Sequence, residues 1–289
     1  LPIMPEQNLA STTDRGLYVQ SIWSLNDWRL TAGIRYDDNN LYGSTTNPRG
    51  SAVYYLDDKS TIKIIYGTAF QEPAPIQLWG GWSGRQANPN LKPEKTQNLE
   101  LIYMLQQENW LHDMSVFMAK YKNVIKEEAE NAGKRDTLGF EYRGRFQFAN
   151  PIHNQKLTGY LYYTYTQTKS SVNYDHALNL WVGDGIANCQ QINTEYNIRY
   201  NACDDMDVEL GDIAPHKINF GLNLPLSPNW NLNLRGNWVS DKTLYVRNPL
   251  RAKGRKNNAY TVIDANLIYY MSPFSIALKV RNLFDESYY

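Results

Sequence analysis

Residues 88–101, NPNLKPEKTQNLEL, change character halfway along. The first half carries Pro89 and Pro93, which fix φ and disfavour a helical conformation in the residues that precede them. Residues 95–105 then show no helical period, and polar and apolar side chains alternate in NLEL (98–101), a period of two that predicts a strand. The stretch therefore predicts an extended loop that leads into a strand, and the fold depends on whether this pattern recurs.

The period of two recurs along the chain, with twelve candidate strands and no helix-periodic segment of helical length. The clearest examples separate an apolar face from a polar one, and they are residues 28–36, 217–224, 230–238 and 274–281. Many candidates run about 9 to 12 residues, the length that a tilted strand needs to cross hydrocarbon, against about 5 or 6 in globular proteins. A soluble sandwich produces the same alternation, so alternation alone does not place the chain in a membrane.

The connections between these strands alternate between short and long. Short ones are expected near residues 25–27, 57–60, 106–109, 225–229 and 271–273. Long polar ones are expected at residues 38–50, 71–94, 123–137, 170–214 and 241–258, while the connection 149–156 has middling length but a short-turn position. Short turns at one end and long loops at the other are typical of outer-membrane barrels. The predicted fold class is all-β, a transmembrane antiparallel β-barrel.

Composition is compatible with this prediction. The 29 basic and 29 acidic residues among 289 give a net charge of zero, and no basic block favours nucleic acid as a partner. A mean hydropathy of -0.57 and the lack of any run of about 18 apolar residues exclude a transmembrane helix, but not a barrel. The 22 Tyr and 8 Trp are many for a soluble domain, and barrels collect such rings at the bilayer interfaces. Composition alone leaves a soluble β-protein open.

The two ends of the sequence indicate a piece of a larger barrel. No targeting signal is visible at Leu1, and the chain ends in NLFDESYY without the aromatic-ended strand that normally closes a bacterial barrel. An open sheet edge is not stable in lipid. Residues 1–289 are therefore expected to be a fragment, the C-terminal portion of a barrel.

Five sequence motifs occur along the chain in an order that is characteristic of one family. YGTAFQEPAPIQL (66–78) precedes NPNLKPEKTQNLELIY (88–103), and LGFEYRGRFQF (138–148), APHKINFGLNL (214–224) and KVRNLFDESYY (279–289) follow. In this order they resemble the strand ends and strand starts of TonB-dependent outer-membrane receptors. The resemblance covers the chain from about residue 16 to its end.

The resemblance implies a barrel of about 22 strands around a plugged lumen, to which this chain contributes about 12 strands and no plug domain. It implies TonB-dependent import of a scarce nutrient across the bacterial outer membrane, most often a ferric siderophore. Haem, cobalamin or a glycan are alternative ligands, and a passive porin-like barrel without a plug is a rival. The implied partners are an iron chelate, outer-membrane lipids and a TonB complex acting through the absent plug. The resemblance favours a monomer and gives no reason to expect a cofactor.

The loop between the motifs at residues 66–78 and 88–103 contains the candidate ligand-binding residues Trp79, Trp82, Arg85 and Gln86. Indole faces stack on planar chelates, and a guanidinium donates charge-assisted hydrogen bonds to an anionic ligand. Residues 71–88 contain no His, which argues against the axial haem ligand common in the haem subgroup. The alternative is that Trp79 and Trp82 pack the loop or join an interfacial belt.

Cys189 and Cys203 are the only cysteines and lie in one predicted outer loop, where a disulfide is expected because the cell surface is oxidising. A bridge across about 15 residues contributes about 3 kcal/mol. Soft-metal binding by the two thiolates is the alternative. The acidic residues that follow, Asp204, Asp205, Asp207 and Glu209, suit either Ca²⁺ or solvent.

Neither a metal site nor catalysis is expected. His112, His153, His176 and His216 show no ligand spacing with one another or with Cys. An enzyme would need a histidine beside a nucleophile or acid at the outer rim, and only His176 and His216 are placed for that, without a convincing partner.

Alternation also predicts which side chains face the lumen. These are mainly cations, which should pair with plug carboxylates, and they are Arg29, Arg35, Lys63, Lys217, Arg235, Lys279 and Arg281. Asn233 should share their face, while Leu232, Leu234 and Leu278 should face lipid.

Overall fold

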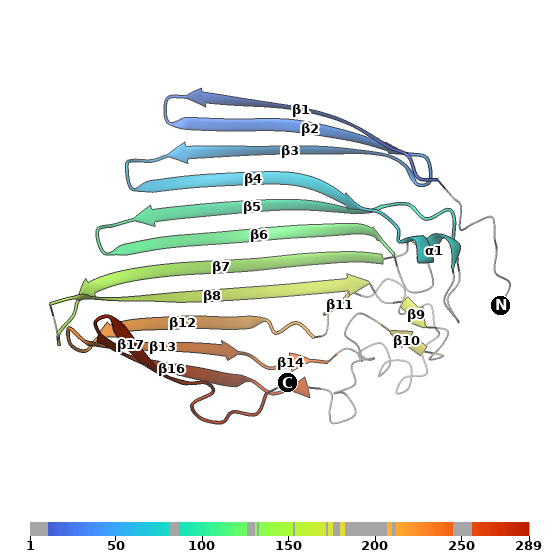
Figure 1. Cartoon of the computed structure of the whole chain (residues 1–289). Helices are drawn as coiled ribbons and strands as arrows, with labels where there is room; N and C mark the ends of the chain where they lie inside the picture. The colour runs from blue at the N-terminus through green and yellow to red at the C-terminus, as the bar shows by residue number, and fades with distance from the viewer. Residues whose placement is uncertain are drawn as a thin grey trace.

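The computed structural model describes residues 11–80, 87–125, 131, 133–152, 154–171, 173–175, 180–182, 207–209, 212–244 and 256–288. Most of them belong to one broad antiparallel sheet (Figure 1). Its path runs through twelve strands in chain order, with β11 pairing to β8 off this path. This confirms the all-β antiparallel prediction, and the sheet is open, with β1 and β17 at its edges.

The first eight strands are β1 (Asp14–Leu25), β2 (Trp28–Asn39), β3 (Gly43–Tyr55), β4 (Ser60–Gln71), β5 (Glu94–Gln106), β6 (Trp110–Val124), β7 (Gly133–Ala149) and β8 (Lys156–Ser171). The path continues with β12 (His216–Pro225), β13 (Trp230–Val239), β16 (Tyr260–Met271) and β17 (Phe274–Val280). Outside it lie β9 (Asn173–Asp175), β10 (Leu180–Val182), β11 (Asp207–Glu209), β14 (Lys242–Thr243) and β15 (Lys256–Asn257). The described residues include no helix that is both long and apolar enough to cross a membrane.

One expected long loop is wrong. Residues 38–50 form the end of β2, a tight turn and the start of β3, with Asn39 opposite Gly43 and Asp37 opposite Thr45. Gly43 has a φ of 83°, which suits glycine at the end of so tight a turn. The sequence of these strand ends predicted a loop because, outside the hydrocarbon layer, both faces of a strand carry polar side chains. For the same reason β7 begins at Gly133, inside the loop expected at 123–137.

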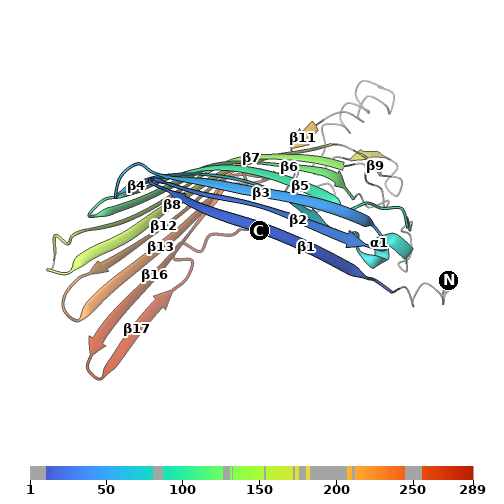
Figure 2. The same cartoon turned by 90° about the horizontal axis from the view of Figure 1, so that it is seen from above.

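The two faces of the sheet differ in chemistry, and the sheet curves across its width (Figure 2). Large apolar side chains on the outer face are exposed, among them Ile64 (47%), Leu101 (49%), Val116 (48%) and Leu138 (48%). Such a face suits contact with lipid hydrocarbon and not with water. Their alternate neighbours point to the inner face, where polar groups and a cavity lie.

Aromatic rings lie over glycines of neighbouring strands at four places. A Cβ built on the glycine would come 2.1 to 2.4 Å from the ring in the pairs Phe117 with Gly139, Phe146 with Gly159, Tyr160 with Gly221, and Phe220 with Gly236. In each pair the two residues face each other across the ladder. The rings therefore fill the space that the missing side chains leave, as in other curved sheets.

Candidate functional site

The loop that follows β4 contains a short helix, α1 (Pro75–Trp79), which sequence periodicity did not predict (Figure 1). Pro75 is the first helical residue, a position where the missing N–H costs nothing. The Gln77 Oε1 accepts a hydrogen bond from the Ala74 N–H at 2.8 Å. Gly80, with a φ of 77°, ends the helix. Proline before and glycine after were the available signal, but five residues are too few to show a helical period.

The stretch 88–94 is packed against this helix. Leu91 is 2% exposed and Leu78 of α1 is 3% exposed, and the two form a buried apolar cluster against which Trp79 and Ile125 pack. The Asn88 N–H also donates to the Gln77 carbonyl at 2.9 Å. Trp79 is thus half-buried and packs against this cluster within the loop. Trp82, Arg85 and Gln86 lie outside the described residues, as do Cys189 and Cys203.

The same stretch is bonded to the loop between β6 and β7. The Asn131 Oδ1 accepts a hydrogen bond from the Lys92 N–H at 2.7 Å, while the Asn131 Nδ2 donates to the carbonyls of Lys92 (2.8 Å) and Asn123 (2.9 Å). The Glu94 Oε1 accepts a hydrogen bond from the Ile125 N–H at 2.7 Å. We call Leu78, Leu91, Lys92, Glu94, Ile125 and Asn131 the outer-loop clamp. No feature of the sequence marked Asn131 for this role.

A polar network at the same end joins the first strands. The Asn39 side chain donates to Asp14, and the Tyr42 hydroxyl donates to the Asp14 Oδ1 at 3.3 Å. Burial, aided by the carboxylates of Glu72 and Asp14, raises the pKa of Tyr42 above its usual range. Tyr42 therefore stays neutral and acts as a hydrogen-bond donor between β1, the β2–β3 turn and the end of β4.

A cavity of about 640 Å³ lies at the opposite end of the strands, beside the short turn between β5 and β6. Its wall contains Arg145, Tyr160, Tyr162, Asn233 and Arg235. The Tyr160 and Tyr162 rings stack with centroids 4.7 Å apart, and the Arg145 Nε donates to the Tyr162 hydroxyl at 3.0 Å. Asn233 and Arg235 thus face the inside of the curve, as expected.

The register explains why this part of the wall is hollow. Arg145, Tyr160, Gly221 and Arg235 follow one another across four strands, so two guanidiniums flank an aromatic ring and a residue without a side chain. Guanidinium and phenol groups suit anionic or planar partners. Sequence reasoning placed the candidate ligand contacts in the outer loop and named no residue of this cavity as a ligand contact. The cavity depends on a register across four strands, which one sequence does not reveal.

Other inner-face cations are paired within the wall. The Arg35 guanidinium contacts the Asp37 carboxylate at 2.7 Å, and Arg143 contacts Asp113 at 2.9 Å. The Arg49 guanidinium lies 4.8 Å from the Tyr18 ring centroid. Arg35 was expected to pair with a carboxylate of the plug, but its carboxylate partner is Asp37, two residues further along the same strand.

Both described histidines lie among aromatic rings. The His112 Nδ1 is 2.9 Å from the Tyr142 hydroxyl, and its ring stacks on Trp110. The His216 Nδ1 is 2.8 Å from the Tyr163 hydroxyl. In these contacts the partner of each histidine is a tyrosine hydroxyl, and no Ser, Cys or carboxylate takes part. His153 and His176 lie outside the described residues, within which no three metal-ligating side chains gather.

Comparison with known proteins defines the class. The family model "TonB dependent receptor-like, beta-barrel" matches residues 5–283, and the chain belongs to this family. These barrels reside in the bacterial outer membrane, and the family comprises receptors and transporters and not enzymes. The vitamin B12 transporter BtuB of Photobacterium profundum is 23% identical over 94% of the chain. An iron-regulated outer membrane virulence protein of Vibrio cholerae is 37% identical over 32% of it.

Solved structures show the same fold. The ferric-catecholate import receptor Fiu from E. coli K12 matches 96% of the chain with a TM-score of 0.70 at 17% identity. The siderophore receptor PirA from Acinetobacter baumannii matches 95% with a TM-score of 0.69, also at 17% identity. The chain spans 39% of the length of BtuB, 41% of Fiu and 42% of PirA.

Proposed function

We propose that this chain is the C-terminal part of the barrel of a receptor that imports a ferric siderophore with energy from a TonB complex. The observation that carries the proposal is the family match over residues 5–283, joined to an inner wall that presents guanidiniums beside aromatic rings. Ferric siderophores are bulky, often anionic chelates, and such a wall suits their passage. In the complete receptor, Arg145 and Arg235 face the plug.

Uptake measurements test this proposal. The full-length receptor is expressed in a host that lacks its own siderophore receptors, and radioactive iron is supplied as a catecholate, a hydroxamate or a citrate chelate. Uptake of at least one chelate should rise at least tenfold, and the rise should disappear in a host without TonB. Uptake that persists without TonB would indicate a passive pore, and no uptake of any chelate would contradict the iron proposal.

Cobalamin is the second candidate ligand, because a vitamin B12 transporter aligns with 94% of the chain. Labelled cyanocobalamin, offered to the same cells, separates the two candidates. TonB-dependent cobalamin uptake without iron uptake would replace the siderophore proposal.

The outer loop that contains Trp79, Trp82, Arg85 and Gln86 is proposed to contact the ligand. Trp79 packs against the outer-loop clamp, so its removal would disturb the loop as well as any contact. The informative variant is therefore Trp82→Ala with Arg85→Ala, which keeps Trp79. Ligand affinity should fall at least tenfold, about 1.4 kcal/mol, because a stacking surface and charge-assisted bonds are both lost.

Trp79→Ala alone is the matched control for loop packing. If the double variant binds the chelate with unchanged affinity, the loop does not contribute to the site. Unchanged migration of unheated samples in gel electrophoresis would establish that both variants assemble.

A further inference from the structure

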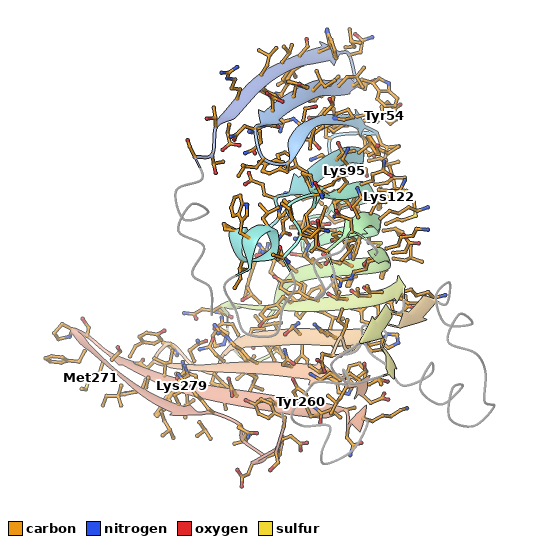
Figure 3. All side chains as sticks on the ribbon, turned by 90° about the vertical axis from the view of Figure 1, so that its right-hand side faces the viewer. Tyr54, Lys95, Lys122, Tyr260, Met271 and Lys279 are labelled. Atoms are coloured by element: carbon orange, nitrogen blue, oxygen red, sulfur yellow. The ribbon has the colours of Figure 1, made fainter. Side chains whose placement is uncertain are left out.

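The cavity beside the short turn between β5 and β6 lies where the sheet bends. Its lining includes Arg145 of β7 and Arg235 of β13, on either side of Tyr160 in β8 and Gly221 in β12. Figure 3, a view from the outer end, shows that the strands after β8 are turned relative to the earlier ones, with Lys279 of β17 on the turned part. The two arginines therefore reach the cavity from the two sides of this bend.

Neither guanidinium of the cavity forms an ion pair within the wall. None of the salt bridges among the described residues involves Arg145 or Arg235. The Arg145 Nε donates to a neutral partner, the Tyr162 hydroxyl, at 3.0 Å. The carboxylate opposite Arg235 in the ladder is Asp264, whose Oδ1 accepts a hydrogen bond from the Asn282 N–H at 2.9 Å. Both arginine side chains are exposed, so their remaining N–H groups can bind a ligand.

The spacing of the two cations suits a large anion. Neighbouring strands are about 4.8 Å apart, so the three steps from β7 to β13 separate the two backbones by about 14 Å. A Cβ built on Gly221 would lie 2.3 Å from the Tyr160 ring, so this ring occupies the room of the missing side chain between the two arginines. One carboxylate, that of Glu108 in the β5–β6 turn, also lines the cavity and is exposed. The wall therefore offers two cations, one acid and a ring to a bulky partner.

We propose that this cavity is a second ligand-binding site on the import path, where Arg145 and Arg235 bind anionic groups of the chelate after it has left its first site. This second site, which rests on the proposed function, takes an anionic chelate with at least two charged groups. The cavity lies at the short-turn end, so an imported ligand reaches it late. Guanidiniums bind anionic oxygens through charge-assisted hydrogen bonds. Their removal should therefore slow transport and leave the first binding step unchanged.

Uptake kinetics of the full-length receptor test this second site, with radioactive iron supplied as the citrate or the catecholate chelate. In the variant with Arg145→Gln and Arg235→Gln, the maximal uptake rate should fall at least fivefold. The dissociation constant of the chelate on cells without TonB should stay within twofold of the parent's. Arg145→Lys with Arg235→Lys keeps both charges and should retain at least half of the maximal rate. Arg145→Glu with Arg235→Glu should lower the rate further than the Gln variant.

The matched control removes two inner-face cations that do not line the cavity, with Arg29→Gln and Lys63→Gln, and should keep the parent's maximal rate. An unchanged rate in the Gln variant of the cavity, or an equal loss in this control, would overturn the proposal. If the double variant does not assemble, Arg235→Gln alone must lower the maximal rate at least twofold.

A carboxylate of the plug is the rival occupant of the cavity. In that case the Gln variant would unseat the plug and make cells sensitive to vancomycin, which would overturn the proposal. Import of neutral chelates alone would contradict the substrate class. If the parent imports no chelate, the proposed function fails and the second site fails with it, whereas a transporting parent with an unaffected Gln variant contradicts only the second site.

Discussion

The two ends of the strands are built by different interactions. At the short-turn end, aromatic pairs face each other across neighbouring strands next to the turns, with ring centroids 4.6 Å apart for Trp28 and Tyr54 and 4.7 Å apart for Trp230 and Tyr269. At the outer end, side chains such as Asn131 and Glu94 bond to main-chain groups of other loops. At the first end ring packing adds to side-chain bonds between turns, such as the one from the Asn229 Nδ2 to the Tyr270 carbonyl at 2.8 Å, whereas at the second end side-chain hydrogen bonds hold the loops to one another.

The difference separates the parts of the molecule that can vary. Aromatic pairs belong to the strand ladder and fix the wall. The outer-loop clamp is held by a few side chains outside the ladder, so loops can change while the sheet stays intact. Substitutions at the outer end should therefore act locally, and those in the wall should act on the whole barrel.

The largest effect is expected for Leu91→Ala, which removes the most buried side chain of the clamp. Loss of a buried leucine costs about 2 to 5 kcal/mol. Here that cost should appear as local opening of the outer loops, measured as faster amide hydrogen exchange in residues 88–94 and at Ile125. The midpoint of guanidinium unfolding of the full-length receptor should stay unchanged.

Leu99→Ala is the control, because Leu99 lies on the outer face of β5 and is 42% exposed. It should leave exchange in residues 88–94 unaltered. If Leu91→Ala lowered the unfolding midpoint as well, the clamp would belong to the same cooperative unit as the sheet.

Gly159→Ala tests the other side of the comparison. A Cβ on Gly159 would lie 2.4 Å from the Phe146 ring and 2.7 Å from the carbonyl oxygen of Gly221, and the carbonyl cannot move without the strand. Overpacking of this kind costs about 1 to 3 kcal/mol, to be read from the denaturant midpoint of the receptor in lipid vesicles.

Gly67→Ala is the matched control, since the nearest atom to its Cβ would be 3.9 Å away, an ordinary contact. Its expected effect is within about 0.5 kcal/mol. Equal effects at Gly159 and Gly67 would mean that the rings move aside at little cost.

Much of the fold could be predicted from the sequence, because period-two alternation reports directly which face a side chain takes. The strands around Leu232 and Leu278 illustrate this, since the register puts both on one face through Leu267. Strand ends could not be predicted where both faces are polar, as at residues 38–50. There the turn geometry at Gly43 decides, and hydrophobicity carries no signal.

The candidate site was less accessible to sequence reasoning. The sequence suggested that the Trp79 ring either stacks on a ligand or packs the loop, and it gave no sign that Trp79 lies beside the buried pair Leu78 and Leu91. The cavity beside Arg145 depends on Gly221 lying between Tyr160 and Arg235, a relation between residues far apart in the chain. Such long-range pairings follow from the register of all the strands in the sheet and not from local propensity.

Asn131→Ala should have a smaller effect at the outer end. It removes three hydrogen bonds to exposed or half-buried main-chain groups of Lys92 and Asn123. With water as a replacement partner, the loss should be about 1 to 2 kcal/mol of local stability. The measurement is the exchange rate of the Lys92 amide in the assembled receptor.

Asn131→Asp separates the bonds of this side chain, because it keeps the oxygen acceptor for Lys92 and loses the Nδ2 donor. Its Lys92 amide should exchange more slowly than in the Ala variant. Equal exchange in both variants would show that the Oδ1 bond does not protect Lys92.

The smallest effect concerns the short turn between β3 and β4, where the Lys59 N–H donates to the Asp57 Oδ1 at 2.7 Å. This bond is the main reason why the pKa of Asp57 lies below its ordinary value. Because the pKa of Asp57 is lowered in the folded state, the bond is fully present when the pH is above about 3.9, the ordinary pKa of aspartate. It is lost as the pH falls through the pKa that Asp57 has in the folded protein. The chemical shift of the Lys59 amide, followed by selective nitrogen-15 labelling, should therefore titrate with a midpoint below 3.9. Asp57→Asn should abolish the titration while keeping an acceptor oxygen at the turn. A midpoint at or above 3.9 would mean that Lys59 does not hold the carboxylate in solution.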